Sequence, residues 1–300
     1  MSFALTDDGV RLYWTSEGPE DGPAIVLVRG LGRSHRYFEP IVSPLVNRGF
    51  RVLRFDNRGA GQSDTPRGPY RAERMGRDVL CVLDAAGLDR AVVLGMSLGG
   101  MIALEAARLA PSRVHGLVLG SVTPRGRGSV RLPLWPQFCL FVSAFLPKVL
   151  ARRIQAFVTI SDGFRMHADA LFDRWDGYAA KEPFTFRGLL SHLAAIRSHD
   201  SVDWAPRVHC PTLVLAGRQD RLVPWRNAIV LEELMPDAQA VVWDDVGHNM
   251  ETEQPQRMAA TIERWQGRTG GAGAFSSDEP SGGVRADHRG LAAPDGTGDR

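Results

Sequence analysis

Gly95-Met96-Ser97-Leu98-Gly99-Gly100 is the stretch of this sequence that decides the fold. It follows an apolar run at residues 91–95 and opens a helical pattern at residues 98–110. A serine between two such glycines, where a strand passes into a helix, predicts a nucleophile elbow, the tight turn that presents a catalytic serine. The flanking glycines are expected because the strained turn leaves little space for side chains. Ser97 is therefore the candidate nucleophile.

Six short runs rich in valine and leucine predict the strands around this turn. They are apolar almost throughout instead of alternating, as expected for strands covered on both faces of a parallel sheet. Helical patterns lie between them, for example at residues 72–86, so the alternation predicts an α/β sheet. An antiparallel hairpin around Asp7-Asp8-Gly9 is expected before it. The six runs are residues 24–29, 51–56, 91–95, 114–120, 211–217 and 238–244.

A long insertion interrupts this alternation after residue 120, and the insertion reads as several helices. Twelve of the chain's 24 aromatic residues fall in it, so we expect them to form a small core of its own or to wall an apolar pocket. Within it, residues 132–150 are apolar but interrupted by prolines, which leaves too little uninterrupted length for the ~20 residues that a membrane span needs. This segment is expected to be a buried or pocket-lining helix.

The chain therefore divides into three predicted parts. Residues 1–120 and 206–266 are expected to form the α/β core domain, and residues 121–205 a helical cap, or lid. The segment 267–300 contains nine glycines and few large apolar side chains. That composition predicts a disordered tail.

A base and an acid for the serine follow the last two predicted strands. A serine must pass its proton to a base that is oriented by a third group. Asp220 and His248 both lie just beyond strand ends, and such positions meet at one edge of a parallel sheet. Asp244 and Asp245 are nearer to His248 in sequence, but they are interpreted as strand-end or turn residues. We predict Asp220 as the acid and His248 as the base, the alternative for His248 being a structural or surface histidine.

Two backbone N–H groups are expected to stabilise the oxyanion of an acyl-transfer reaction. Leu98, which follows the nucleophile, supplies one of them. The other is expected from Leu31, in the loop Arg29-Gly30-Leu31-Gly32 after the first parallel strand. The alternative for this loop is an ordinary glycine turn.

Five motifs in a fixed order resemble those of the α/β-hydrolase superfamily. The resemblance covers the chain from about Val10 to Trp265 and implies a mostly parallel eight-stranded sheet flanked by helices, with a helical cap inserted after the sixth strand. It also implies a Ser-His-Asp triad beneath that cap. The motifs are RGLG at 29–32, FDNRGAGQSD at 55–64, GMSLGG at 95–100, GRQDRLVP at 217–224 and GHNMETEQP at 247–255.

The sequence departs from the family pattern at Arg29, where the family more often has histidine before the glycine. This departure concerns the shape of the oxyanion loop or a hydrogen bond made by that histidine. Because the oxyanion donor is a backbone N–H and not this side chain, we expect the site to function. The motif at 55–64 is interpreted as a structural loop without a chemical role.

Within the superfamily, the elbow residue and its partners narrow the reaction. Ser97 in place of aspartate argues against haloalkane dehalogenases and epoxide hydrolases, and Asn249 stands where carbon–carbon bond hydrolases typically carry tryptophan. The chain resembles the carboxylesterase, enol-lactonase and methylesterase branch. This resemblance implies hydrolysis of a small-molecule ester or lactone with an apolar portion. The alternatives are a small-molecule binding or receptor module on the same fold, or acyltransferase or perhydrolase activity.

Composition excludes several other classes. The 36 basic and 34 acidic residues leave a net charge of +2, which is too small to favour nucleic acid. Three widely separated cysteines suggest neither disulfides nor a zinc site. The N-terminus lacks the pattern of a signal peptide, so a cytoplasmic location without membrane association is expected. No metal or organic cofactor is expected, and the sequence leaves the oligomeric state open.

Overall fold

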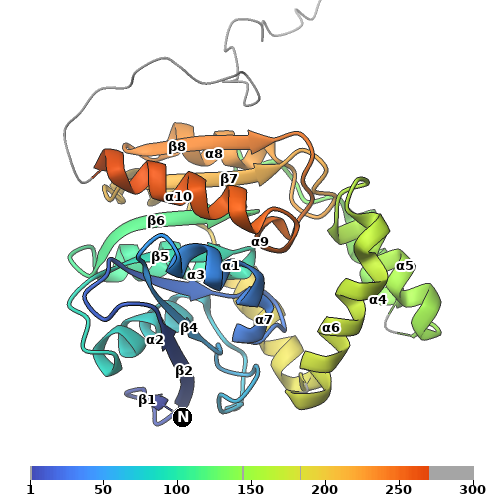
Figure 1. Ribbon diagram of the computed structural model, residues 1–300, viewed down its shortest axis with the longest axis horizontal. Helices are drawn as coiled ribbons and strands as arrows, with labels where there is room; N and C mark the ends of the chain where they lie inside the picture. The colour runs from blue at the N-terminus through green and yellow to red at the C-terminus, as the bar shows by residue number, and fades with distance from the viewer. Residues whose placement is uncertain (1, 144, 183, 270–300) are drawn as a thin grey trace, which may run out of the picture.

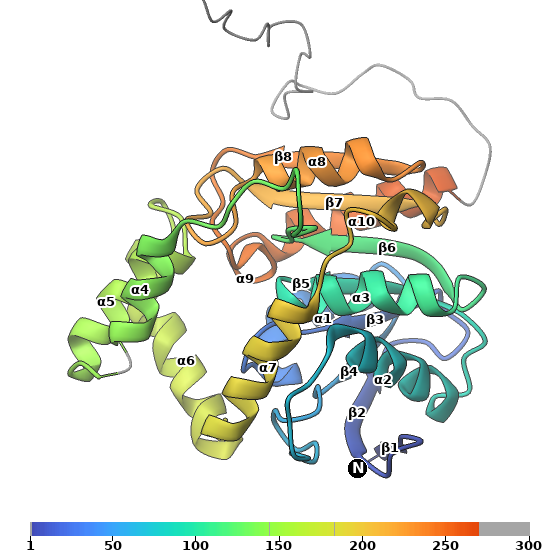
Figure 2. The same ribbon diagram turned by 180° about the vertical axis from the view of Figure 1, so that it is seen from behind.

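An eight-stranded sheet forms the centre of the protein (Figures 1 and 2). The computed structural model describes residues 2–143, 145–182 and 184–269. The strand order is β1-β2-β4-β3-β5-β6-β7-β8; β2 pairs antiparallel with β1 and β4, and the other neighbours are parallel. The predicted fold class is thus confirmed. The strands are β1 (Ser2–Leu5), β2 (Arg11–Glu17), β3 (Ala24–Val28), β4 (Arg51–Phe55), β5 (Ala91–Met96), β6 (Val114–Gly120), β7 (Thr212–Gly217) and β8 (Ala238–Trp243).

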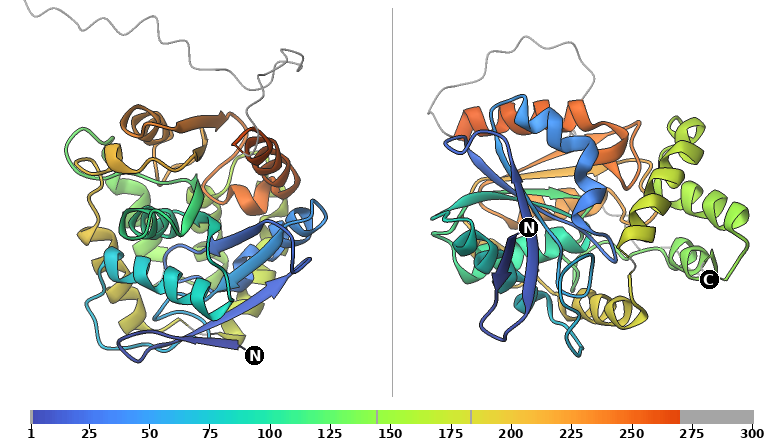
Figure 3. Two further views of the ribbon diagram at one scale, coloured as in Figure 1. Left: turned by 90° about the vertical axis from the view of Figure 1, so that its left-hand side faces the viewer. Right: turned by 60° about the horizontal axis from the view of Figure 1, so that its bottom comes forward.

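Helices cover both faces of the sheet, which explains why its parallel strands are apolar almost throughout (Figure 3). Along β3, Ile25 and Leu27 belong to the apolar cluster on one face, and Val26 and Val28 to the cluster on the other. The first face packs against α1 (Glu39–Val46), α9 (Met250–Glu253) and α10 (Pro255–Thr269), and the second against α2 (Ala72–Ala85), α3 (Leu98–Leu109) and α8 (Arg226–Leu234).

Four helices are inserted between β6 and β7, where the cap was expected. In Figure 1, α4, α5 and α6 stand beyond the carboxyl ends of the parallel strands. Phe172, Trp175 and Tyr178 of α6 pack with Tyr37, which lies in the 3-10 helix η1 (His35–Phe38), into a small core that joins the cap to the sheet domain. The cap helices are α4 (Leu134–Ser143), α5 (Lys148–Thr159), α6 (Ala168–Lys181) and α7 (Phe186–Ser198).

The prediction of a buried or pocket-lining helix at residues 132–150 is wrong in large part. Helix α4 ends at Ser143 and α5 begins at Lys148, after Pro147. About half of the apolar side chains of α4 are exposed. Leu140 and Ser143 of α4 line the cavity that also contains Ser97. The exposed large side chains of this segment are Leu134, Trp135, Phe138, Phe141, Phe145, Val149 and Leu150.

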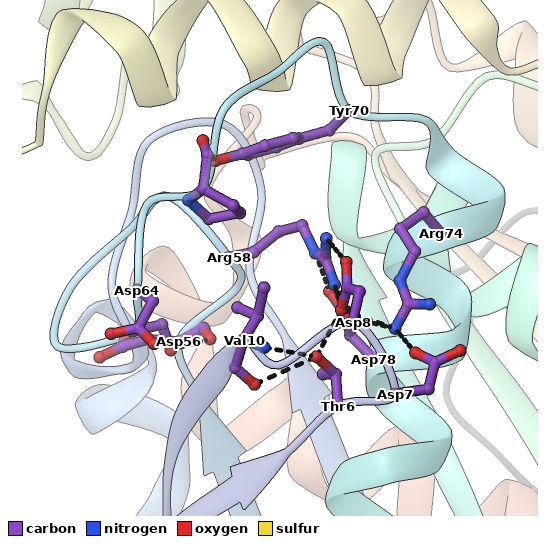
Figure 4. A network of polar contacts seen from close by, with 12 residues as sticks. Thr6, Asp7, Asp8, Val10, Asp56, Arg58, Asp64, Tyr70, Arg74 and Asp78 are labelled. Carbon is purple, nitrogen blue, oxygen red and sulfur yellow. Dashed lines mark hydrogen bonds and ion pairs between the residues drawn. The ribbon is translucent and has the colours of Figure 1, made fainter.

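A buried arginine in the loop after β4 ties the N-terminal hairpin to α2 (Figure 4). Arg58 donates to both carboxylate oxygens of Asp78 at 2.6 and 2.7 Å, and to Asp8 in the hairpin turn at 2.9 Å. Burial lowers the pKa of Arg58, but the hydrogen bonds and charges of the two carboxylates outweigh it, so the pKa lies above its ordinary value. The contacts of this loop are those of a structural element, as interpreted from the sequence.

The described chain ends in α10, which runs to Thr269 and so extends three residues into the segment predicted as a tail. Arg268 in its last turn donates to Gln239 Oε1 at 2.7 Å, which accounts for the longer helix. The rest of the predicted tail, residues 270–300, lies outside the described residues. No helix in the described part of the chain has the length and apolar character to cross a membrane.

Candidate active site

Ser97 sits at the turn between β5 and α3 with a backbone φ of 55° and ψ of −120°. The left-handed φ is costly for a residue with a side chain, and such strain is concentrated at functional sites. The Ser97 N–H donates to the Gly120 carbonyl at 2.9 Å, which joins the turn to β6. A methyl group on Gly99 would lie 1.9 Å from the Val28 carbonyl oxygen, so α3 packs tightly against β3 here. The conformation is that of the predicted elbow.

Asp220 and His248 meet beyond the ends of β7 and β8. His248 Nδ1 lies 2.8 Å from Asp220 Oδ2. The other carboxylate oxygen, Oδ1, accepts the backbone N–H groups of Leu222 at 2.8 Å and Val223 at 2.9 Å. These bonds fix the carboxylate on the imidazole. With Nδ1–H donated to Asp220, the lone pair of the imidazole is on Nε2, where a general base needs it.

The surroundings of His248 raise the pKa of its imidazole. Burial lowers that pKa, because it removes water from the charged ring. The charge of Asp220 and its hydrogen bond act in the opposite direction and outweigh burial, with a smaller contribution from Glu251. The ring is therefore a stronger base than a histidine in water.

Ser97 and His248 line one cavity of about 440 Å³, whose floor is the sheet edge and whose roof is the cap. The cap contributes both apolar and polar groups to its wall. Of the cap aromatics, Phe184 lines the cavity, while Phe172, Trp175 and Tyr178 form the cap core, so both interpretations of the aromatic residues hold in part. The cap residues that line the cavity are Leu140, Ser143, Gln155, Thr159, Phe184, Leu189 and Ile196.

The loop after β3 lies against the elbow. A methyl group on Gly30 would be 3.2 Å from Ser97 Cβ and 3.7 Å from the Leu98 nitrogen, so no side chain separates the two segments. Leu31 lines the cavity, and its N–H forms no hydrogen bond within the described residues. Leu98 begins α3, so its N–H has no partner inside the helix. The two predicted oxyanion donors thus lie on adjoining segments.

Arg29 replaces the histidine more usual in the family, and its side chain turns out to be buried. Its guanidinium lies 2.5 Å from Glu251 Oε1 and donates to Asn249 Oδ1 at 3.2 Å, one residue beyond His248. From the sequence alone, the effect of this arginine is open. Its contacts join the predicted oxyanion loop to the histidine loop.

The cap also bonds to the histidine loop. The Thr159 carbonyl, at the end of α5, accepts the N–H of His248 at 3.1 Å and Nδ2 of Asn249 at 3.1 Å. Sequence reasoning missed this contact and the polar cap residues Ser143 and Gln155. No motif surrounds them, and only the packing of α4 and α5 brings them to the cavity.

One buried cluster has the composition of a metal site. His35, Asp56 and Glu182 bring ligand atoms within 4.8 Å of one another. Asp56 Oδ1, however, already accepts the backbone N–H of His35 and lies 2.9 Å from the Nδ1 atom of His35. Arg36 Nε lies 2.9 Å from Glu182 Oε1. The guanidinium thus supplies positive charge at the place where a cation would bind, and the cluster links the sheet domain to the end of α6.

Comparison with known proteins places this fold and site in a class. A family model described as alpha/beta hydrolase fold matches residues 23–253, so the chain belongs to that family. It is 31% identical over 242 residues to the protein of Pseudomonas syringae pv. syringae (strain B728a) named "Putative carbamate hydrolase RutD". That alignment covers 78% of this chain and 90% of the relative.

Solved structures that are similar to this chain include other hydrolases. A hydrolase from Pseudomonas aeruginosa PA01 superimposes with a TM-score of 0.76 at 27% identity, over 89% of this chain and 98% of that one. The enol-lactonase from Burkholderia xenovorans LB400 gives a TM-score of 0.76 at 22% identity, over 89% and 100% of the two chains. The second likeness concerns the fold alone. The chain is a hydrolase of the α/β-hydrolase fold.

Proposed function

We propose that this protein is a serine hydrolase that cleaves a carboxylic ester or lactone with an apolar portion. The observation that carries the proposal is the cavity in which Ser97, strained at its elbow, and His248, held by Asp220, both line the wall. A serine with an oriented base is the arrangement that nucleophilic catalysis requires. The apolar lining by Leu140, Leu189 and their neighbours supports an apolar portion of the substrate.

In the proposed mechanism, Ser97 Oγ attacks the carbonyl carbon while His248 Nε2 takes its proton. The tetrahedral oxyanion accepts hydrogen bonds from the N–H groups of Leu31 and Leu98. It collapses to an acyl-enzyme, and His248 returns the proton to the leaving alcohol. Water then attacks the acyl-enzyme and gives a proton to His248. The second tetrahedral intermediate collapses to release the acid, and His248 returns that proton to Ser97 Oγ. Asp220 orients His248 and stabilises the imidazolium throughout.

Carbamate hydrolysis is the second candidate, because the relatives at 30–31% identity carry that name. The same residues would serve it, since a carbamate carbonyl is also attacked by a nucleophile and also passes through an oxyanion. The two candidates differ in the covalent intermediate, which is an acyl group in one case and a carbamoyl group in the other.

The first test is labelling with a fluorophosphonate, followed by intact mass measurement of the wild type and of Ser97→Ala. We expect one adduct on the wild type and none on the variant. An adduct on both proteins would show that the labelled nucleophile is a residue other than Ser97. If neither is labelled, the proposal of an activated Ser97 fails and a binding module on this fold becomes the better account.

The substrate class is tested with matched esters, lactones and carbamates of graded chain length. We expect turnover of esters or lactones that increases with the length of the apolar chain. Turnover of carbamates alone would replace the first candidate by the second. Addition of alcohols or thiols distinguishes acyl transfer, because the product then partitions between water and the added acceptor.

A further inference from the structure

The cavity contains a cationic side chain without an acidic partner. Arg33 follows β3 in the loop that carries Leu31, and it is partly buried and lines the cavity together with Ser97. Its guanidinium carbon lies 4.4 Å from the ring centroids of both Tyr37 and Trp175. Within residues 2–143, 145–182 and 184–269, no carboxylate is at ion-pair distance from it. The charge of Arg33 is thus not neutralised by the protein.

The two rings do not sandwich the guanidinium between them. Their centroids are 5.7 Å apart, and each is 4.4 Å from the guanidinium carbon, so both rings lie on the same side of it. The Tyr37 hydroxyl donates to the Trp175 carbonyl at 3.2 Å, which fixes the rings against each other. Since Arg33 lines the cavity, a ligand there can approach it.

The other charges near the cavity do not compensate Arg33. Arg29 also lines the cavity, but its charge is matched by the buried carboxylate of Glu251. Among the described lining residues there is no aspartate or glutamate. Burial lowers the pKa of Arg33, yet a guanidinium remains protonated at neutral pH. A partly desolvated cation that contacts the Tyr37 and Trp175 side chains and no carboxylate among the described residues is a favourable site for an anion.

We propose that Arg33 binds a carboxylate of the substrate, so that the molecule cleaved at Ser97 carries a free carboxylate in addition to its scissile bond. A planar guanidinium can bind a planar carboxylate through two parallel hydrogen bonds. The apolar side chains of Phe184, Leu189 and Ile196 line the same cavity and can hold the carbon chain that joins the two groups. This inference rests on the proposed function, because it assigns the substrate class of the same cavity.

The test compares anionic esters with neutral esters of similar length. One pair carries the charge in the acyl part: the mono-4-nitrophenyl ester of glutaric acid and 4-nitrophenyl pentanoate. A second pair carries it in the alcohol part: 4-(butanoyloxy)benzoate and phenyl butanoate. The readout is the ratio of kcat/KM for the anionic ester to kcat/KM for the neutral one, which is insensitive to changes that affect both esters equally.

We expect the wild type to prefer the anionic ester in at least one pair. Arg33→Gln should lower that ratio about ten- to a hundredfold, because hydrogen bonds to a charged group are lost. Arg33→Lys should retain part of the preference, since it keeps the charge without the planar fork. Arg226→Gln is the matched control: its guanidinium also lies over an aromatic ring, that of Trp225 at 4.8 Å, but outside the cavity. This control should leave the ratio unchanged.

A wild type that prefers the neutral ester in both pairs, or a ratio that is the same in Arg33→Gln, would overturn the proposal. Calorimetric titration of Ser97→Ala with glutarate and with pentanamide needs no turnover. It therefore distinguishes a failure of the proposed ester hydrolysis from a failure of carboxylate binding. Binding of glutarate that disappears in Ser97→Ala/Arg33→Gln supports the carboxylate site even if no ester is cleaved. Absence of glutarate binding together with absence of ester preference overturns it.

Discussion

Arg29 and Glu251 are 222 positions apart in the sequence and form an ion pair with 2.5 Å between Nη1 and Oε1. Only 5% of the arginine side chain and none of the glutamate side chain is exposed to solvent. The pair joins the loop after β3 to α9, the short helix that follows His248. It therefore holds the predicted oxyanion loop and the histidine loop in a fixed relation.

Removing one partner of this pair should destabilise the protein strongly. In Arg29→Met the Glu251 carboxylate stays buried without its cation, which costs about 3–5 kcal/mol in the free energy of unfolding. Urea unfolding measures the loss. The double variant Arg29→Met/Glu251→Gln should recover much of it, because no lone charge remains.

The control for that prediction is Asp245→Asn, which breaks the exposed ion pair of Asp245 with Arg257. It should change the free energy of unfolding by less than about 1 kcal/mol. Equal unfolding midpoints for Arg29→Met and wild type would show that the buried pair contributes nothing.

The pH dependence of ester hydrolysis should follow His248. The imidazole must be neutral to accept the serine proton, so kcat/KM falls as pH falls through its pKa. That pKa is raised, so the acid limb should lie above about 6.5, the ordinary value for histidine. Asp220→Asn removes the charge that raises the pKa and leaves the burial that lowers it. The limb should therefore move to lower pH, with a fall of roughly 10⁴ in kcat.

Asp245→Asn again provides the comparison, since this exposed carboxylate lies three residues before His248 in the sequence. Its profile should coincide with that of the wild type. An unchanged acid limb in Asp220→Asn would mean that another group controls the reaction.

Alanine should have opposite effects on stability at two helical glycines, because one lies in the close contact between α3 and β3 and the other has open space around it. In Gly99→Ala the new methyl group would overlap the Val28 carbonyl, so the elbow must shift; we expect a loss of about 1–3 kcal/mol or more, together with loss of ester turnover. In Gly177→Ala, within α6, the methyl group meets nothing within 4 Å. This variant should gain about 0.5–1 kcal/mol. Urea unfolding measures the free energy of unfolding of both variants, and equal values would contradict the packing described.

The hairpin and α2 should depend on the buried bond between Arg58 and Asp78. Asp78→Ala leaves the guanidinium with Asp8 alone, so we expect a loss of about 3–5 kcal/mol in unfolding free energy. Asp7→Asn, in the same turn, touches only the exposed pair with Arg74 and should cost less than about 1 kcal/mol. If the two variants unfold alike, Arg58 does not anchor the hairpin.

The sheet could be predicted because each of its parallel strands is recognisable from its own apolar run, without knowledge of distant contacts. Each of β3 to β8 lies within about one residue of a largely apolar run. Strands β3 to β7 are mostly buried, as strands covered on both faces are, and the edge strand β8 is half-buried. Ser97, Asp220 and His248 could be proposed for a related reason. Each follows a strand, and parallel strands bring their carboxyl ends to one edge.

Which side chains of the cap are buried could not be predicted, because nothing in the local sequence distinguishes its inner side chains from its outer ones. Phe138 and Phe172 look alike in the sequence, yet the first is 56% exposed and the second 3%. Arg33 was missed for the same reason: the chain has many arginines, and only the approach of Trp175 from the cap makes this one distinct.

The bonds between Thr159 and the histidine loop bear on attempts to exchange caps between relatives. The acceptor is a backbone carbonyl, so these two bonds depend on the position of residue 159 at the end of α5 and not on its side chain. A transplanted cap whose second helix is one residue longer or shorter would misplace that carbonyl and, with it, the imidazole. A chimera that exchanges the cap should therefore keep the end of α5 in place, because that helix end both lines the cavity and bonds to the loop that carries His248.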